Sequence, residues 1–167
     1  MRIYINNKII KFNYKYKSNE KGNIQVKFIF NKLLASTCCL FSDCEALQSI
    51  NLSSFNTTNV NNMFNMLAGC TFLQLIDLSS FNTTNVKNMS HMFQGCCFLQ
   101  SIDLFSFNAT NIKNMLDMFS QCSSLQSINL SSFNTTNVED MNGMLFRCSS
   151  LKKENVKISS NGKKNIE

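Results

Sequence analysis

Cysteine is the residue type in this chain that could do the most chemistry, and the 167 residues include eight of them. Five cysteines recur at intervals of 26 residues: Cys44, Cys70, Cys96, Cys122 and Cys148. Zinc ligand pairs usually lie about two to four residues apart, so this spacing does not resemble a zinc site. Stacked neighbours could approach disulfide distance, but parallel side chains give poor disulfide geometry. Because buried free cysteine behaves as a small hydrophobe, we predict a packed column, with Cys38, Cys39 and Cys97 as thiols that could be exposed.

Methionine and histidine are the other side chains that could bind a metal. Two methionines recur in each repeat, Met63 and Met66 in the first copy, but methionine at helical spacing is typical of a hydrophobic core. His91 is the only histidine and falls between two inward-facing methionines, which predicts a position on a helix surface. No acid, base or nucleophile is repeated or clustered. We therefore expect no enzyme activity, no metal site and no cofactor.

These residues belong to a 26-residue repeat that occurs four times without insertion or deletion. Each copy begins with Leu-x-x-Ile-x-Leu, in which alternate apolar residues indicate a short strand. Apolar residues then follow at offsets 0, +3, +7 and +10, which in the first copy are Val60, Met63, Leu67 and Cys70. This is the stripe of a short helix, with Asn59 and its equivalents in the later copies as the expected N-cap and Thr58 as the alternative. The repeat predicts an α/β solenoid: a right-handed, leucine-rich-repeat-like coil with one short parallel strand and one short helix per repeat, stacking like residues in core ladders.

The same pattern divides the chain into five parts. We predict an N-terminal hairpin cap at 1–20, a degenerate first repeat at 21–46, four regular repeats at 47–150, a closing strand at 151–158 and a flexible tail at 159–167. Apolar and polar residues alternate on both sides of Asn6-Asn7, and asparagine tolerates the backbone of tight hairpin turns. Atypical terminal repeats are expected because the ends of a stack must be shielded from water. In the closing strand, the 26-residue period places Val156 beneath Leu130.

The net charge of +6 is concentrated near the two ends of the chain. Residues 1–33 carry eight Lys/Arg against one Glu, and residues 147–167 carry six against two. Because these basic residues do not line a repeated face, we do not expect a nucleic-acid partner. No apolar run approaches the roughly 20 residues of a membrane span, and the start lacks the pattern of a secretory signal. Either the protein is not exported by that route, in which case a cytoplasmic location is the alternative, or this chain lacks its leader.

One repeat position is an asparagine in all four copies, and each of these asparagines begins a glycosylation sequon. Four of the seven Asn-x-Ser/Thr sequons share this position: Asn56, Asn82, Asn108 and Asn134. Asparagine after a strand can satisfy backbone groups in a turn, layer after layer, which is the interpretation we favour. Glycosylation is the alternative and requires a eukaryotic secretory route.

The repeat as a whole resembles that of a known family. The copy at Leu73–Cys96 reads Leu-x-x-Ile-Asp-Leu-Ser-x-Phe-Asn-Thr-x-Asn-Val-x-x-Met-x-x-Met-Phe-x-x-Cys. This is similar to the 26-residue repeat of BspA-like leucine-rich-repeat surface proteins, over roughly residues 24–156. The resemblance implies a leucine-rich-repeat-like solenoid at a cell surface or outside the cell, often in adhesion or host contact. It implies no catalytic residues, because the family shares none.

If the repeat is a scaffold, function should lie where the copies differ at outward positions. Six residues meet this criterion: Phe72, Leu75, Asp77, Phe98, Asp103 and Phe105. Leu75 and Phe105 each stand at a repeat position where the other three copies have serine. Phe72 and Phe98 share one repeat position, which is serine at its next two occurrences. Exposed aromatic patches can mark contact sites, although single exposed apolar residues are also ordinary.

Two functional hypotheses follow from this pattern. The first is a non-enzymatic binding module that recognises a protein partner through its strand side, in cell adhesion or host contact. The alternative is a structural spacer, or a fragment of a longer repeat array, with no ligand of its own. The identity of the partner and the oligomeric state are not set by the sequence.

Overall fold

The repeats form a compact unit separate from the N-terminal segment. A computed structural model describes residues 2–5, 8–10 and 25–158, and the chain divides into a first unit at residues 1–33 and a second unit at residues 34–167. No part of the chain that the structure describes forms a helix long and apolar enough to cross a membrane.

The first unit contains a three-stranded antiparallel sheet. Its strands are β1 (Arg2–Ile5), β2 (Lys8–Ile10) and β3 (Val26–Ile29), in the order β2-β1-β3. β1 and β2 flank Asn6-Asn7, where the sequence predicts a hairpin, and the turn itself lies outside the described residues. β3 pairs with β1, whereas the 26-residue period had assigned this segment to a first repeat. Whether these strands cap the stack stays a prediction.

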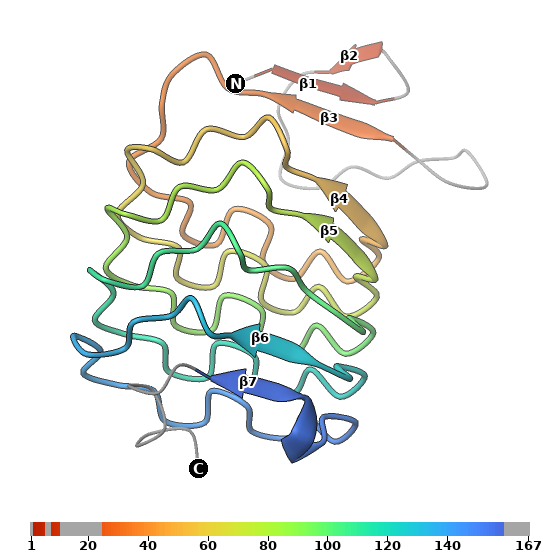
Figure 1. Ribbon diagram of the computed structural model, residues 1–167. Helices are drawn as coiled ribbons and strands as arrows, with labels where there is room; N and C mark the ends of the chain where they lie inside the picture. Colours follow the sequence, from red (N-terminus) through yellow and green to blue (C-terminus); the bar gives the residue numbers. More distant parts are fainter. Residues whose placement is uncertain (1, 6–7, 11–24, 159–167) are drawn as a thin grey trace. The chain divides into compact units, whose positions relative to one another are not determined.

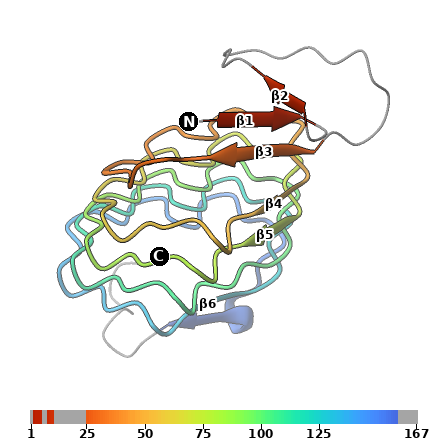
Figure 2. The ribbon, with the colours of Figure 1, turned by 90° about the horizontal axis from the view of Figure 1, so that it is seen from above.

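The second unit stacks the repeats in register as successive layers (Figure 1). On one side, β4 (Ser49–Asn51) pairs in parallel with β5 (Leu75–Asp77), and β6 (Ile128–Leu130) pairs in parallel with β7 (Val156–Ile158). Viewed down the stack in Figure 2, β4, β5 and β6 lie on the same side of the superposed layers. We call this the strand side.

The other half of each layer is a run of turns, which we call the turn segments: residues 36–44, 62–70, 88–96, 114–122 and 140–148. Parallel bridges join them at a constant spacing, for example between Asn62 and Asn88 and between Asn88 and Asn114. The layers are therefore held together on the turn side from the first segment to the last.

The predicted α/β solenoid with one helix per repeat is wrong. The described residues contain no α-helix, and the strand side has only short two-stranded parallel sheets. In the turn segment at 62–70, the N–H of Met66 donates to Met63 and the N–H of Cys70 to Leu67, at 3.2 Å each. The intervening N–H of Leu67 donates to Met92 of the next layer at 2.9 Å. A helix would use every N–H within its own segment, so this alternation excludes it.

Left-handed backbone residues explain why the turn segments are not helical. One repeat position has positive φ in all four copies: Asn65 (53°), His91 (58°), Asp117 (53°) and Gly143 (62°). A second position, four residues later, also has positive φ in every copy. Two left-handed residues per segment break a right-handed helix, and asparagine, aspartate and glycine adopt this conformation at the lowest cost.

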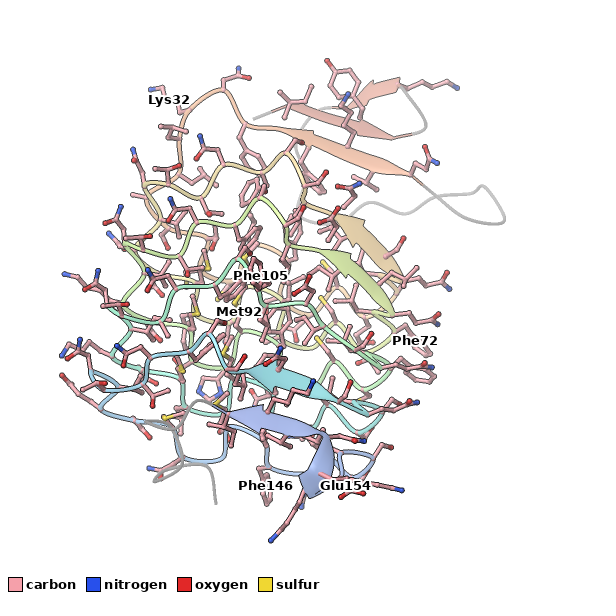
Figure 3. All side chains as sticks on the ribbon, in the orientation of Figure 1. Lys32, Phe72, Met92, Phe105, Phe146 and Glu154 are labelled. Atoms are coloured by element: carbon pink, nitrogen blue, oxygen red, sulfur yellow. The ribbon has the colours of Figure 1, made fainter. Side chains whose placement is uncertain are left out.

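The core lies between the strand side and the turn segments. Met63, Met89 and Met115 are fully buried and Met141 is 5 % exposed, which confirms the predicted methionine ladder. Phenylalanines also stack from layer to layer, as Phe93 and Phe119 do with ring centroids 5.3 Å apart. Figure 3 shows how the side chains fill the interior around Met92. Because each repeat supplies the same side chains at the same height, like packs on like.

The last strand departs from the 26-residue period. A short 3₁₀ helix, η1 (Lys153–Asn155), precedes β7, and Val156 pairs with Ile128 rather than lying beneath Leu130 as predicted. Ile158 takes the place beneath Leu130. The turn of η1 thus absorbs two extra residues and keeps Glu154 out of an apolar position.

Candidate functional site

The outward side chains of the strand side form the candidate site. In β5, the inward Ile76 is partly buried and packed against the core, while its neighbours Leu75 and Asp77 are exposed, since side chains alternate along a strand. After the strand, a carboxylate or amide oxygen closes a turn in every repeat, as Oδ1 of Asp77 does by accepting the N–H of Ser79 at 3.0 Å. These turns fix the direction of the side chains that follow.

Two large apolar side chains project from this surface. Leu75 is 70 % exposed and Phe105 is 88 % exposed, although both belong to residue types that normally bury most of their area. The equivalent residues in the first and fourth repeats are serines. Burial of two such side chains by a partner would remove substantial apolar surface from water.

Two aspartates lie between these apolar side chains. Asp77 and Asp103 occupy the same repeat position in adjacent layers, and both are exposed. Hydrogen bonds from the Ser79 hydroxyl and N–H lower the pKa of Asp77, and Oδ1 of Asp103 accepts the N–H of Phe105 at 2.9 Å. Asparagine makes the same turn in the first and fourth repeats, as Asn51 does with Ser53. The turn therefore needs an acceptor and not a charge, which leaves the charge available for a ligand.

An aromatic pair occupies one repeat position, directly before the first leucines, Leu73 and Leu99, of the second and third repeats. Phe72 and Phe98 stack with ring centroids 5.0 Å apart and an interplanar angle of 26°. They stay 46 % and 45 % exposed, so the pair covers little of its own surface. Such stacked, half-exposed rings give a rigid apolar contact at low entropic cost.

All six candidate residues belong to or immediately precede the second and third repeats. Leu75 lies in β5, and Phe105 lies in the turn that Asp103 closes one layer later, so Asp77 and Asp103 stand between them along the repeat. We call Phe72, Leu75, Asp77, Phe98, Asp103 and Phe105 the strand-face site (Figure 3 labels Phe72 and Phe105). The arrangement presents apolar groups on both sides of a doubly acidic centre. It suits a partner with a cation flanked by apolar groups.

The cysteine column is a packing feature in most of its length. Cys70, Cys96, Cys122 and Cys148 are buried, which confirms the prediction, and each thiol donates to a carbonyl oxygen of the preceding turn segment, as Cys70 does to Phe41 at 3.1 Å. Burial raises the pKa of Cys70 to about 12 and that of Cys148 to about 11. These thiols stay protonated at neutral pH and are poor nucleophiles.

The other cysteines differ from this column. Cys44 is exposed, so the prediction of burial is wrong there, because Cys44 belongs to the first turn segment and has no earlier turn segment to pack against. Cys38 and Cys39 are exposed as predicted, with their Sγ atoms 3.5 Å apart, and Cys97 is half-buried. Among the described residues, no group of three or more His, Cys, Asp or Glu side chains could hold a metal ion.

His91 occupies a left-handed turn position rather than a helix surface. Its Nδ1 lies 3.8 Å from Oδ2 of Asp117, and its ring meets the Phe64 ring edge-on at 5.6 Å between centroids. Asp117 follows His91 by one repeat of 26 residues, so the sequence contained a signal for the contact between their side chains, which sequence reasoning missed.

Sequence reasoning also missed a polar surface on the turn side. Asn85, Asn111 and Asn137, expected as helix N-caps, instead donate their amides to carbonyls of the preceding layer at 2.7–2.8 Å. Together with Lys87 and Lys113 they line an open hollow of about 610 Å³. The sequence signal for this polar surface was lysine at the same repeat position in two adjacent copies, Lys87 and Lys113.

The repeated sequon position forms the predicted ladder of turns. Oδ1 of Asn56 accepts the N–H of Thr58 at 2.9 Å, and Asn82, Asn108 and Asn134 repeat this bond. The prediction of a turn ladder is confirmed. Glycosylation at these asparagines stays an untested alternative.

Comparison with known proteins places the repeat in a family. The family model described as "Mycoplasma protein of unknown function, DUF285" matches residues 13–107 and 35–161. The chain belongs to this family. No curated protein and no solved structure shows significant similarity to the chain.

Proposed function

We propose that this protein is a non-enzymatic binding module that recognises a protein partner through the strand-face site. The observation that carries the proposal is the exposure of Leu75 and Phe105, at 70 % and 88 %, on a surface where the flanking repeats have serine. Large exposed apolar side chains grouped on one surface are typical of contact sites.

The chemistry of the site favours a basic partner segment. Asp77 and Asp103 supply two negative charges in adjacent layers, Leu75 and Phe105 supply apolar side chains beside them, and the stacked Phe72–Phe98 pair adds an apolar contact earlier in the same two repeats. Opposite charges steer association and fix register, while the buried apolar anchors supply most of the affinity. A partner loop with lysine or arginine between apolar side chains fits both features.

The motif's resemblance to BspA-like surface repeats supports a setting for this binding. We propose that the chain is displayed at a cell surface, where the site serves adhesion or host contact. Protease shaving of intact cells that express the protein tests this setting. Release of peptides from residues 47–150 supports it, and complete protection of the chain on intact cells would contradict it.

The binding site itself is tested by substituting the residues of the flanking repeats. The face variant carries Leu75→Ser, Asp77→Asn, Asp103→Asn and Phe105→Ser, all of which the first and fourth repeats already accommodate at these positions. The control variant carries Lys87→Asn and Lys113→Asn on the turn side, where the first repeat has Asn61. Both variants should fold as the parent does.

Binding is measured as saturable attachment of labelled protein to cultured epithelial cells and to immobilised matrix glycoproteins. We expect the face variant to lose attachment at least about tenfold, because several anchors are removed together, and the control to keep it. Equal attachment by the parent and the face variant would exclude the strand-face site. Surface display without attachment by the parent would favour a structural spacer.

A further inference from the structure

The hollow on the turn side holds both basic residues of the middle of the chain. Residues 34–146 include two basic residues, Lys87 and Lys113, against seven acidic ones. Both lysines are exposed, and both line the open hollow of about 610 Å³. Small-ligand sites have volumes of about 300–1,000 Å³, so this hollow is large enough for such a ligand. The positive charge of an otherwise acidic stretch is therefore concentrated in one place.

The two lysines project from one row of hydrogen-bonded backbone. The N–H of Lys113 donates to the carbonyl oxygen of Lys87 at 2.8 Å, and the N–H of Lys87 donates to that of Asn61 at 2.9 Å. Paired backbones lie about 4.8 Å apart, so the two ammonium groups can reach a single anion. Like charges at paired positions are destabilising, and the first repeat fills this position with the neutral Asn61. The fold does not need the two charges, which points to a ligand as their role.

One of the two positive charges is compensated by the next layer. Nζ of Lys113 lies 3.0 Å from Oε1 of Glu139, which occupies the same repeat position one layer later. Lys87 forms no ion pair within the part of the chain that the structure describes. The row formed by these three side chains therefore keeps one uncompensated positive charge, which suits a ligand with a single negative charge.

The rest of the lining consists of hydrogen-bonding groups. Each of its three asparagine amides donates one N–H to a carbonyl oxygen of the preceding layer, at 2.7–2.8 Å: Asn85, Asn111 and Asn137. A primary amide has two N–H donors and one acceptor oxygen, so each amide keeps a donor and an acceptor without a partner among the described residues. The Thr110 hydroxyl also makes no hydrogen bond there, whereas the equivalent hydroxyl of Thr58 donates to an asparagine of its own layer at 2.6 Å.

We propose that this hollow binds a sugar that carries one acidic group, a carboxylate or a sulfate. Lys87, with Lys113 beside it, binds the acidic group through charge-assisted hydrogen bonds, which are stronger than neutral ones. The amides and the Thr110 hydroxyl both donate and accept, as sugar hydroxyls do, so they orient the ring. An apolar ligand would find little to pack against, because all six lining residues are polar or charged. The inference does not rest on the strand-face site, none of whose residues line the hollow.

The affinity of this site for one sugar should be low. Water screens an exposed charge pair, and a single sugar makes few contacts, so we expect a dissociation constant on the order of 1 mM. One site of this strength does not hold a protein on a cell. The variant with Lys87→Asn and Lys113→Asn therefore still serves as the control for attachment through the strand-face site.

The test is an NMR titration of the full chain with five probes. Two are acidic sugars on the same lactose core, 3′-sialyllactose with a carboxylate and 3′-sulfolactose with a sulfate. The other three are lactose, sodium sulfate and N-acetyl-aspartate amide. We expect both acidic sugars, or one of them, to shift the side-chain amide signals of Asn85 and Asn111 in a saturable way, and the other three probes to leave them nearly unchanged. The acidic sugar that binds more tightly identifies the acidic group.

Substitutions in the row of charges make the test specific. Lys87→Asn together with Lys113→Asn should weaken binding of the acidic sugar about tenfold, because hydrogen bonds to charged groups are lost. Glu139→Gln should strengthen binding about twofold, because it releases Lys113 from an exposed ion pair. A misfolded variant would not produce such a gain. The matched control carries Leu75→Ser and Phe105→Ser on the strand side and should bind the sugar as the parent does.

Three outcomes would overturn the proposal. The first is the absence of a saturable shift with either acidic sugar at concentrations well above the expected dissociation constant. The second is an equal shift with lactose, sulfate or N-acetyl-aspartate amide, which would indicate a site for any sugar, for the free anion or for an acidic peptide. The third is unchanged binding by the folded double lysine variant. Each can occur while the face variant still loses attachment to cells, so failure here is distinct from failure of the proposed function.

Discussion

The turn side and the strand side of the second unit use one repeat in two different ways. On the turn side, backbone hydrogen bonds join every pair of adjacent layers, and the methionines beneath them are buried in every copy. On the strand side, β4 pairs with β5 and β6 with β7, but residues 101–104 of the third repeat form no strand. Because every junction on the turn side is bonded in the same way, we expect the layers to keep their register when outward residues of the strand side change.

The sharpest contrast between inside and outside lies within one repeat. Phe119 is fully buried and stacked on Phe93, whereas Phe105 is 88 % exposed. Phe119→Ala should lower the free energy of unfolding by about 3–5 kcal/mol, because it removes buried apolar surface and leaves a cavity. Phe105→Ala should change it by less than about 0.5 kcal/mol. Urea unfolding of both variants measures the difference. Equal destabilisation by the two would contradict the assignment of core and surface.

The left-handed positions of the turn segments can be tested with two glycines. Gly69 and Gly95 both have φ of 73°, but a Cβ at Gly69 would collide with Oδ1 of Asp43, while a Cβ at Gly95 would meet nothing closer than 3.7 Å. Gly95→Ala should therefore cost only the backbone preference, about 1 kcal/mol, and Gly69→Ala about 2 kcal/mol. Thermal unfolding compares the two variants.

A second substitution separates the two causes. Asp43→Ala removes the colliding carboxylate and should lower the cost of Gly69→Ala most of the way toward that of Gly95→Ala, because only the Asp43 Cα, 3.3 Å from the added Cβ, stays close. If Gly69→Ala and Gly95→Ala were both neutral, the positive φ at these positions would be wrong.

The buried thiols predict a loss of stability at alkaline pH. The pKa of Cys70 is raised by burial from 9.0 to about 12 in the folded protein. Above pH 9 the unfolded chain loses this proton while the folded protein keeps it, so the free energy of unfolding falls as pH rises, by about 1 kcal/mol per pH unit for each such thiol. The stabilisation is complete below pH 9 and is lost as pH approaches 12. Cys70→Ala should flatten the decline between pH 9 and 11, measured by urea unfolding, and an unchanged slope would refute this account.

The smallest effect is expected from the ion pair on the turn side. Lys113 Nζ lies 3.0 Å from Glu139 Oε1, with both side chains largely exposed. Glu139→Gln should change the free energy of unfolding by less than about 1 kcal/mol, because water screens exposed pairs. A loss comparable to that of Phe119→Ala would show that cohesion on this side depends on charge rather than on backbone bonds.

The period and the core of this fold follow from the sequence, but the conformation of the turn segments does not. The offsets 0, +3, +7 and +10 are shared by a helix and by successive turns closed at every third residue, so periodicity alone could not separate them. The signal that favours turns was Asn65, Asp117 and Gly143 at one position, residue types that accept a left-handed backbone. The register of β7 was also hidden, since nothing in the sequence marks the two residues that η1 absorbs.

For the candidate site, the sequence was sufficient to locate exposed side chains but not their arrangement. Leu75 and Phe105 stand out because serine occupies their positions in the other copies, and the structure shows both exposed. The close stacking of Phe72 on Phe98 needed the stacked layers to be seen. The hollow beside Lys87 depends on asparagine side chains that bridge layers, which the helix prediction had assigned to caps.

The central claim is that each turn segment is bonded to the next layer and not wound into a helix. Through-hydrogen-bond NMR couplings from the amide nitrogen of Leu67 test it directly. The account predicts a coupling to the carbonyl carbon of Met92, whose oxygen lies 2.9 Å from this nitrogen. A coupling from Leu67 to the carbonyl carbon of Met63, four residues earlier, would demonstrate a helix and contradict the account.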